Sequence, residues 1–307
     1  MSAPAALPQI ADTAEVMRTT GWSDYALLDS GGGRKLERYG PYTVVRPEPQ
    51  CMWSPRLPQA QWDAADAVFD PTDEDDAGHW RFRERLQEIW PLSWGPVRFH
   101  GRFTAFRHLA FFPEQAANWA FLRDAVKSAG PQPKVLNLFG YTGVASLVMA
   151  AAGAAVTHVD ASKKAVAWAR ENAELSGLAD RPLRWITEDA RKYVAREVRR
   201  GSTYEGIILD PPKYGRGPDG QVWRLFEDLP ELAGLCVRLL SENAKFLVLN
   251  AYAERISGPA LAGLLAEKMA GRGGRIAWGE LALEEARGDR AIGMSFFARW
   301  TKDGGTA

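Results

Sequence analysis

Apolar runs that alternate with segments of helical spacing fill the chain from about residue 130 onward. The apolar runs are rich in Val, Ile, Leu and Phe, as buried strands are, and cover residues 135–139, 155–160, 183–189, 204–210 and 245–251. The helical segments cover residues 143–152, 163–176, 190–200, 221–240 and 258–270. Such alternation is typical of βαβ units. The pattern therefore predicts a doubly wound α/β domain with a central parallel sheet.

Two further strands are predicted around residues 279–283 and 291–300. Only the polar segment EEARGDR separates them, which is too short for a crossover helix. We therefore expect the sheet to end in an antiparallel hairpin, which a plain dinucleotide-binding fold does not have.

The region before residue 113 has a different pattern, with short apolar or aromatic runs broken by Gly and Pro. This pattern is typical of hairpins. The first residues are small and rich in Pro and Ala, and we expect them to fray. We divide the chain into a flexible N-terminus (1–20), a smaller β-rich domain on the substrate side (21–112) and the α/β domain (113–307).

Charge narrows the choice of partner. The 307 residues include 38 basic and 38 acidic side chains, so a nucleic acid has to meet a local basic patch. The candidate basic positions are Arg34, Lys35, Arg98, Arg102 and the Arg191–Arg200 helix. An ordinary solvated surface is the alternative for each of them.

Cysteine use and hydropathy favour a cytoplasmic protein. Cys51 and Cys236 match no metal or disulfide spacing, and Cys236 lies at helical spacing from apolar neighbours, as a buried structural thiol would. No leader pattern is present, and no run reaches the ~18 apolar residues of a membrane span. The acidic run at 63–76 lacks the turn glycine of a calcium loop, so we expect a solvated loop there and no metal.

The predicted strand at 135–139 leads directly into a glycine turn, Gly140–Gly143, and a helix. Glycines allow a ligand to approach the backbone, and the helix start offers free N–H groups. The full G-x-G-x-x-G pattern of pyrophosphate binding is absent. A merely tight turn is the alternative.

Acidic residues follow the next two predicted strands. Asp160 lies about 20 residues after the glycine turn, where a carboxylate can accept ribose hydroxyls. Glu188 and Asp189 end the third strand, where a carboxylate can accept from an adenine amino group. The alternative for Asp160 and Asp189 is a helix N-cap.

The fourth predicted strand ends in Asp210-Pro211-Pro212-Lys213-Tyr214. The two prolines remove backbone donors and hold the chain extended, so we expect carbonyls and the Asp210 carboxylate to face the cleft as acceptors. Tyr214 adds a stacking surface for a planar substrate. A Pro-rich turn without function is the alternative.

Taken together, the segments NLFGYTG, VDASKKAVAWARENAELSGL, EDA and DPPKY resemble the Rossmann-like class I S-adenosylmethionine-dependent methyltransferases. More narrowly, they are similar to bacterial enzymes that methylate cytosine C5 or guanine N7 of 23S ribosomal RNA. The resemblance covers about residues 97–300 and implies S-adenosyl-L-methionine as cofactor. The cofactor-binding positions that it implies are Gln115, Asn137, Phe139, Gly140, Tyr141, Thr142, Gly143, Asp160, Ala161, Ser162, Glu188, Asp189, Ala190 and Asp210. The catalytic positions are Asp210, Pro211, Pro212, Lys213 and Tyr214.

The sequence departs from that family in two respects. The cytosine C5 enzymes begin with a PUA RNA-binding domain, which has no match here, and they carry a nucleophilic cysteine where this chain has Leu249–Ala253. Cytosine C5 needs a thiolate to activate it, whereas guanine N7 has an available lone pair. We therefore favour methylation of guanine N7 of ribosomal RNA. A methyltransferase of small molecules or protein side chains, or a cofactor-binding protein that kept the fold, is the alternative, supported by the neutral net charge.

Overall fold

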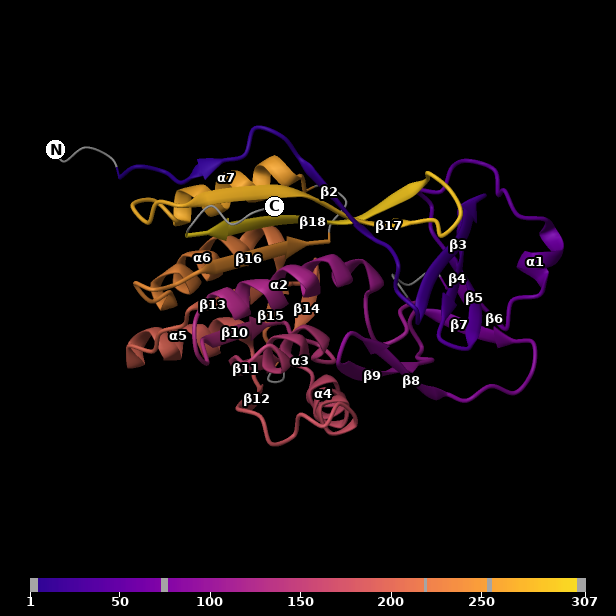
Figure 1. Ribbon diagram of the computed structural model, residues 1–307, viewed down its shortest axis with the longest axis horizontal. Helices are drawn as coiled ribbons and strands as arrows, with labels where there is room; N and C mark the ends of the chain where they lie inside the picture. The colour runs from indigo at the N-terminus through magenta and orange to yellow at the C-terminus, as the bar shows by residue number, and fades with distance from the viewer. Residues whose placement is uncertain (1–4, 73–76, 218–219, 253–255, 303–307) are drawn as a thin grey trace. The chain divides into compact units, whose positions relative to one another are not determined.

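The computed structural model describes residues 5–72, 77–217, 220–252 and 256–302. The chain forms two compact units (Figure 1). The first combines Met1–Met17, Asn118–Leu281 and Met294–Ala307. The second combines Arg18–Ala117 and Ala282–Gly293. Two strands of the C-terminal hairpin, β17 (Arg275–Glu284) and β18 (Ala291–Thr301), pass from one unit into the other.

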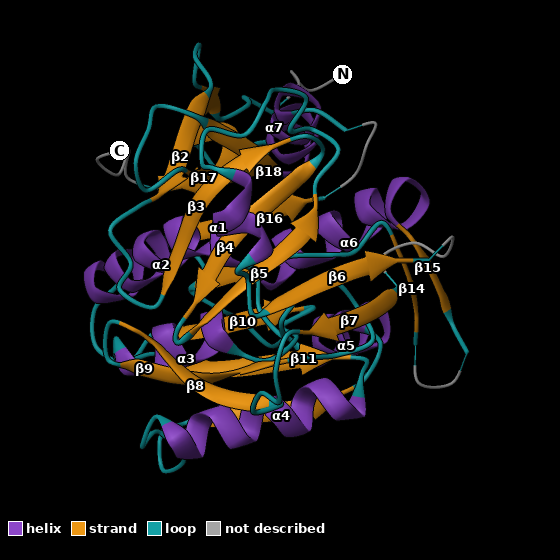
Figure 2. Cartoon of the chain, turned by 90° about the vertical axis from the view of Figure 1, so that its right-hand side faces the viewer, coloured by secondary structure: helices purple, strands orange, loops and turns teal. Residues whose placement is uncertain are grey.

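The first unit is built on a sheet of nine strands within the described residues, in the order β1-β17-β18-β16-β13-β10-β11-β12, with β2 also paired to β17. Its central strands are mutually parallel: β10 (Lys134–Leu138), β11 (Ala155–Asp160), β12 (Leu183–Thr187), β13 (Gly206–Leu209) and β16 (Phe246–Ala251). Figure 2 shows β10 and β11 side by side in this sheet. Strand β18 runs antiparallel to β16 and lies next to β17. The structure thus confirms the predicted α/β sheet with its terminal hairpin.

Helices pack on this sheet through two separate apolar clusters. Their bounds are α2 (Ala116–Ser128), α3 (Val144–Ala151), α4 (Lys163–Leu175), α5 (Ala190–Arg200), α6 (Leu225–Leu239) and α7 (Gly258–Lys268). One cluster joins α5, α6 and α7 to the sheet, and includes Leu209 and Leu232. The other joins α2 and α3 to it, and includes Leu122 and Met149. Each fully buried Leu stabilises the fold by about 1.5–3 kcal/mol.

Two elements of the first unit were not predicted. Helix α2 precedes the first central strand, and a small hairpin of β14 (Tyr214–Arg216) and β15 (Val222–Arg224) follows β13. Because β15 occupies residues 222–224, helix α6 begins at Leu225 instead of residue 221.

The first twenty residues include two strands, β1 (Gln9–Ile10) and β2 (Glu15–Thr19), although we expected a flexible segment there. Both strands pair with β17. A β-carbon built on Gly279 of β17 would collide with the carbonyl oxygen of Glu15. Strand β2 can therefore pack against β17 at this position only because residue 279 is a glycine. Strands this short show no recognisable hydrophobic period in the sequence, so they were not predicted. They form by pairing with the edge of β17. The predicted domains were continuous segments with boundaries at residues 20 and 112, whereas each compact unit combines separate segments of the chain.

The second unit contains a five-stranded sheet, a two-stranded hairpin and the short helix α1 (Gln59–Asp63). The sheet consists of β3 (Tyr25–Gly31), β4 (Arg34–Tyr39), β5 (Tyr42–Pro47), β6 (Ala67–Pro71) and β7 (Gly78–Phe82). The hairpin pairs β8 (Ile89–Trp94) with β9 (Val97–Arg102). A 3-10 helix, η1 (Pro113–Gln115), lies close to the end of this unit in the sequence.

Candidate active site

The turn after β10 has an unusual backbone. Phe139 and Tyr141 have φ angles of 57° and 49°, in the left-handed region that side chains rarely adopt, and Gly143 has φ of 82°. Each such non-glycine residue costs on the order of 1 kcal/mol or more and persists only where its surroundings hold it. The Gly140 N–H donates to the carbonyl of Val159 (3.1 Å), and the Tyr141 N–H donates to Asp160 Oδ2 (2.9 Å). Strand β11 therefore holds the turn in place.

The glycines of this turn make room for parts of the protein itself. A β-carbon on Gly140 would lie 2.4 Å from Cε1 of His158, and one on Gly143 would lie 2.8 Å from Cβ of Ala169 in α4. Both distances are well inside van der Waals contact. Internal packing therefore requires glycine at both positions, and the approach of a ligand to the backbone of this turn stays a prediction.

His158 is a buried residue of β11 that the sequence analysis did not single out. Its Nδ1 lies 3.0 Å from Ser146 Oγ, and Asn137 Nδ2 donates to the same oxygen (2.8 Å). Burial lowers the pKa of His158 to about 3, so the ring is neutral at physiological pH. Asn137, implied as a cofactor contact, thus takes part in an internal network that links β10, α3 and β11. The contact between the His158 imidazole and the glycine turn appears only in the folded structure, so the sequence alone gave no indication of this role.

Asp160 ends β11 and joins two loops. Its Oδ2 accepts from Tyr141 N–H, and its Oδ1 accepts from Ser162 N–H (2.8 Å). Burial raises the pKa of Asp160, while the two N–H donors act in the opposite direction. Ser162, and not Asp160, caps α4, because its Oγ accepts from Ala165 N–H (3.2 Å). Each oxygen of Asp160 keeps a further lone pair, which fits the hydroxyl donors of a ribose.

The acids after β12 have other partners. Asp189 is the N-cap of α5, where it accepts from the N–H groups of Arg191 (2.9 Å) and Lys192 (3.2 Å). Glu188 accepts from Arg196 Nη1 at 2.6 Å. For Asp189 the capping interpretation, which the sequence left open, describes the observed hydrogen bonds.

The segment after β13 is anchored by its own carbonyls. Pro212 O accepts from Trp223 Nε1 (2.7 Å), and Lys213 O accepts from Leu225 N–H (3.1 Å). These two carbonyls hold β15 and the start of α6, so they are not the free acceptors that we expected. Asp210 follows β13 directly, and the Tyr214 side chain is 51% exposed. The Tyr214 ring is therefore accessible to a stacking partner.

The strand order brings most of the predicted residues to one edge of the sheet. Strands β13, β10, β11 and β12 are parallel neighbours, so their carboxyl ends meet at the same edge. The positions that follow these ends are Phe139, Gly140, Tyr141, Thr142 and Gly143 after β10, Ala161 and Ser162 after β11, Glu188, Asp189 and Ala190 after β12, and Asp210, Pro211, Pro212, Lys213 and Tyr214 after β13. Asp160 is the last residue of β11. Gln115 belongs to the second unit, where it is buried in η1.

Several predicted basic positions are not free surface charges. Lys35 is buried, with its Nζ 3.5 Å from Glu48 Oε2, and Arg102 is buried as well. Charged side chains are buried where they are paired, as Lys35 is. Arg34 and Arg98 are exposed.

Three arginines of α5 also have acidic partners. Arg191 pairs with Asp228 (2.7 Å), Arg196 with Glu188 (2.6 Å) and Arg200 with Glu197 (2.9 Å). Because these arginines are paired with carboxylates, helix α5 offers less free positive charge to RNA than the sequence predicted.

The thiols are both buried. Burial raises the pKa of Cys51 to about 11 and raises that of Cys236 still further. The described residues contain no group of three potential metal ligands, and residues 73–76 of the acidic run lie outside them. No helix in the described part of the chain is long and apolar enough to cross a membrane.

The strand order, the antiparallel last strand and the residues at the carboxyl edge define a class I methyltransferase. No family model matches the chain. A crystal structure of a SAM-dependent methyltransferase from Agrobacterium tumefaciens is 51% identical, with a TM-score of 0.94 over 99% of this chain and 98% of that chain. The chain belongs to the S-adenosylmethionine-dependent methyltransferases, and its cofactor is S-adenosyl-L-methionine.

Curated relatives share part of the chain. Ribosomal RNA large subunit methyltransferase K/L of Shewanella frigidimarina is 30% identical over 169 residues, which is 54% of this chain and 23% of the relative. Ribosomal RNA large subunit methyltransferase I of Aeromonas salmonicida is 36% identical over 105 residues, which is 34% of this chain and 26% of the relative. The chain thus spans about a quarter of the length of these relatives.

Proposed function

We propose that this enzyme methylates a base of 23S ribosomal RNA and that the acceptor is guanine N7. The similarity to two ribosomal RNA large subunit methyltransferases supports the RNA substrate. The observation that carries the choice of acceptor is the end of β16, where Asn250 and Ala251 stand without a thiol. The cytoplasmic location stays a prediction from the sequence.

The state of the two cysteines supports guanine N7. Attack on cytosine C6 needs a thiolate next to the base. Cys236 is fully buried in the apolar cluster of α6, and Cys51 is a buried residue of the second unit with a pKa of about 11. Neither thiol ionises at neutral pH. Guanine N7 attacks through a lone pair and loses no proton, so the protein has only to align the reactants.

We propose a role in binding or catalysis for each of the following residues. The cofactor supplies an activated methyl group when it is bound. The Asp160 carboxylate accepts from the ribose hydroxyls with the lone pairs that Tyr141 and Ser162 leave free. Asp210 accepts from the amino or ring N–H of the base, and Tyr214 stacks on its face. We keep Asp189 as the cap of α5 and give the Pro212 and Lys213 carbonyls a structural role.

One observation favours a second candidate, a methyltransferase of small molecules or protein side chains. The arginines of α5 are paired with carboxylates, and Lys35 and Arg102 are buried, which leaves fewer free cations for RNA than the sequence indicated.

Methyl transfer to ribosomal RNA tests the choice. RNA from a strain that lacks this enzyme is incubated with the protein and labelled S-adenosylmethionine, and the product nucleosides are separated. We expect label in N7-methylguanosine, retained with Asp124→Ala, an exposed control on α2, and lost with Asp210→Ala. Label in 5-methylcytidine contradicts the assigned acceptor. Cofactor binding without labelled RNA contradicts the RNA substrate and favours the second candidate.

A further inference from the structure

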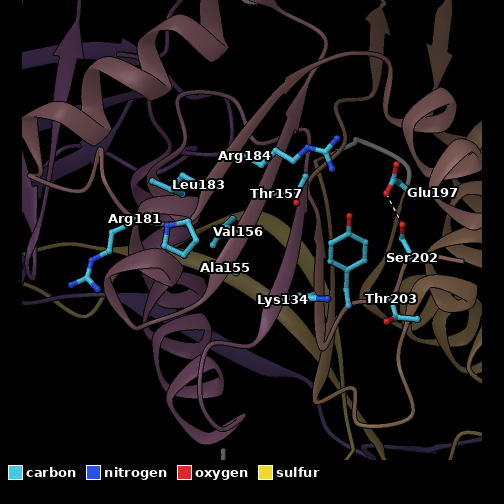
Figure 3. A pocket seen from close by; sticks show the side chains of 12 residues that line it. Lys134, Ala155, Val156, Thr157, Arg181, Leu183, Arg184, Glu197, Ser202 and Thr203 are labelled. Atoms are coloured by element: carbon cyan, nitrogen blue, oxygen red, sulfur yellow. Dashed lines mark hydrogen bonds between the residues drawn. The ribbon is translucent and has the colours of Figure 1, made fainter. Parts of the chain in front are cut away.

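An open groove of about 500 Å³ lies at the amino ends of the central strands, whereas the glycine turn follows the carboxyl end of β10. Figure 3 shows the side chains that line this groove. The residues that line it stand at or near the amino ends of β10, β11 and β12 and in the loop before β13. They are Lys134, Ala155, Val156, Thr157, Arg181, Pro182, Leu183, Arg184, Glu197, Ser202, Thr203 and Tyr204. Its volume falls within the range of ligand sites, which is roughly 300–1,000 Å³. None of the roles assigned above involves it.

Three cations of the groove are available to a ligand. Lys134, Arg181 and Arg184 are exposed, and none of them forms an ion pair within 4.0 Å among the residues that the structure describes, although Arg184 is near enough to Glu197 to help lower the pKa of that carboxyl. By contrast, Arg191, Arg196 and Arg200 of α5 form ion pairs with carboxylates. The hydroxyl group of Thr203 adds a donor beside the cations of the groove.

The acids near the groove already have partners. The Glu197 carboxylate accepts from Arg200 (2.9 Å) and from Ser202 Oγ (2.7 Å, dashed in Figure 3). Glu205 accepts from the backbone N–H of Lys134 (2.7 Å). Arg200 pairs with Glu197, and the three cations Lys134, Arg181 and Arg184 outnumber the two carboxylates, so the groove keeps an excess of positive charge and favours an anion.

We propose that this groove binds the phosphodiester backbone of the RNA substrate. The proposal rests on the RNA function proposed above. Phosphate oxygens accept from Arg, Lys and hydroxyl groups in nucleic-acid interfaces, and such contacts position the strand without reading its sequence. A groove with separated cations fits a chain of phosphates better than a compact neutral ligand.

The groove contacts nucleotides other than the one that is methylated. Strand β10 has five residues, so its two ends lie about 16 Å apart. At a rise of about 3.4 Å per nucleotide along the axis of a stacked strand, this separation corresponds to roughly five nucleotides. The groove is therefore an anchoring surface, which affects RNA binding and leaves the chemical step unchanged.

The test compares two double charge reversals. Arg181→Glu with Arg184→Glu alters the groove, and Arg238→Glu with Arg275→Glu makes the same charge change at exposed positions elsewhere in the first unit. Affinity for a 23S ribosomal RNA fragment is measured by fluorescence anisotropy over a range of salt concentrations. We expect the groove variant to bind RNA at least tenfold more weakly, with a salt slope that is smaller by about one for each phosphate that the variant no longer neutralises. KM for RNA should rise at unchanged kcat.

Equal affinity for RNA in both variants and in the wild type overturns the groove proposal, as does an equal loss in both variants. If the groove variant does not bind S-adenosylmethionine, Arg181→Gln with Arg184→Gln replaces it, and unchanged RNA affinity in that variant overturns the proposal. If the wild type methylates no RNA, the proposed function fails first, whereas RNA methylation that is indifferent to the groove contradicts the groove proposal alone.

Discussion

His158 lies directly against Gly140: a β-carbon on the glycine would stand 2.4 Å from Cε1 of the imidazole. The residue next in sequence to Gly140, Tyr141, donates its N–H to Asp160, two positions after the histidine. The histidine and Asp160 therefore both hold this turn, one through packing and the other through a hydrogen bond.

We predict that Gly140→Ala destabilises the protein by about 1–3 kcal/mol, since overpacking a filled interior costs this much. It should also weaken cofactor binding, because the turn has to move. Combining it with His158→Ala should recover part of both losses by vacating the space. Unfolding in urea and calorimetric titration with S-adenosylmethionine measure the two effects. Additive losses in the double variant would show that the ring does not limit this position.

A second prediction concerns pH. Burial lowers the pKa of His158 from 6.5 to about 3, so between these values the unfolded chain binds a proton that the folded protein does not. The stability that the neutral histidine contributes is complete above pH 6.5 and is lost as the pH falls toward 3. The loss is on the order of 5 kcal/mol. His158→Gln should show a shallower fall in unfolding free energy over this range, and an identical pH profile would contradict the assignment.

Asp160 and Asp189 should respond differently to the same substitution. In Asp160→Asn the amide presents a donor to one of the two N–H groups, Tyr141 or Ser162, so one hydrogen bond is lost together with a ribose acceptor. We expect at least a tenfold weaker Kd for S-adenosylmethionine. Asp189→Asn should leave the Kd near the wild-type value, since Asn caps helices as well as Asp does. Similar losses in both variants would give Asp189 a binding role that we have not assigned.

The cysteines should be dispensable for methyl transfer. Cys51→Ala with Cys236→Ala removes both thiols of the chain. Each substitution vacates a small buried volume and should lower stability, but methyl transfer to RNA should continue at a similar kcat at 25 °C. Loss of transfer in a variant that still binds S-adenosylmethionine would favour cysteine-dependent chemistry and the C5 acceptor.

Sequence patterns located the elements well where the signal was local. Strand β11 and helix α5 have the predicted bounds, because a buried strand and an amphipathic helix display their periods within a few residues. Helix α2 and the β14–β15 hairpin were missed. Strands β1 and β2 were missed for a different reason, since they form only against the edge of β17.

The sequence by itself determined the order of strands and helices in the α/β unit, and with it the edge at which Gly140, Asp160 and Asp210 lie, because the direction of parallel strands follows from their connections. Only the tertiary structure decided the roles of individual side chains and carbonyls. It made Asp189 a helix cap, engaged the Pro212 carbonyl and buried Lys35 in an ion pair. Such roles depend on hydrogen bonds and contacts between side chains and backbone that are brought together only when the elements pack.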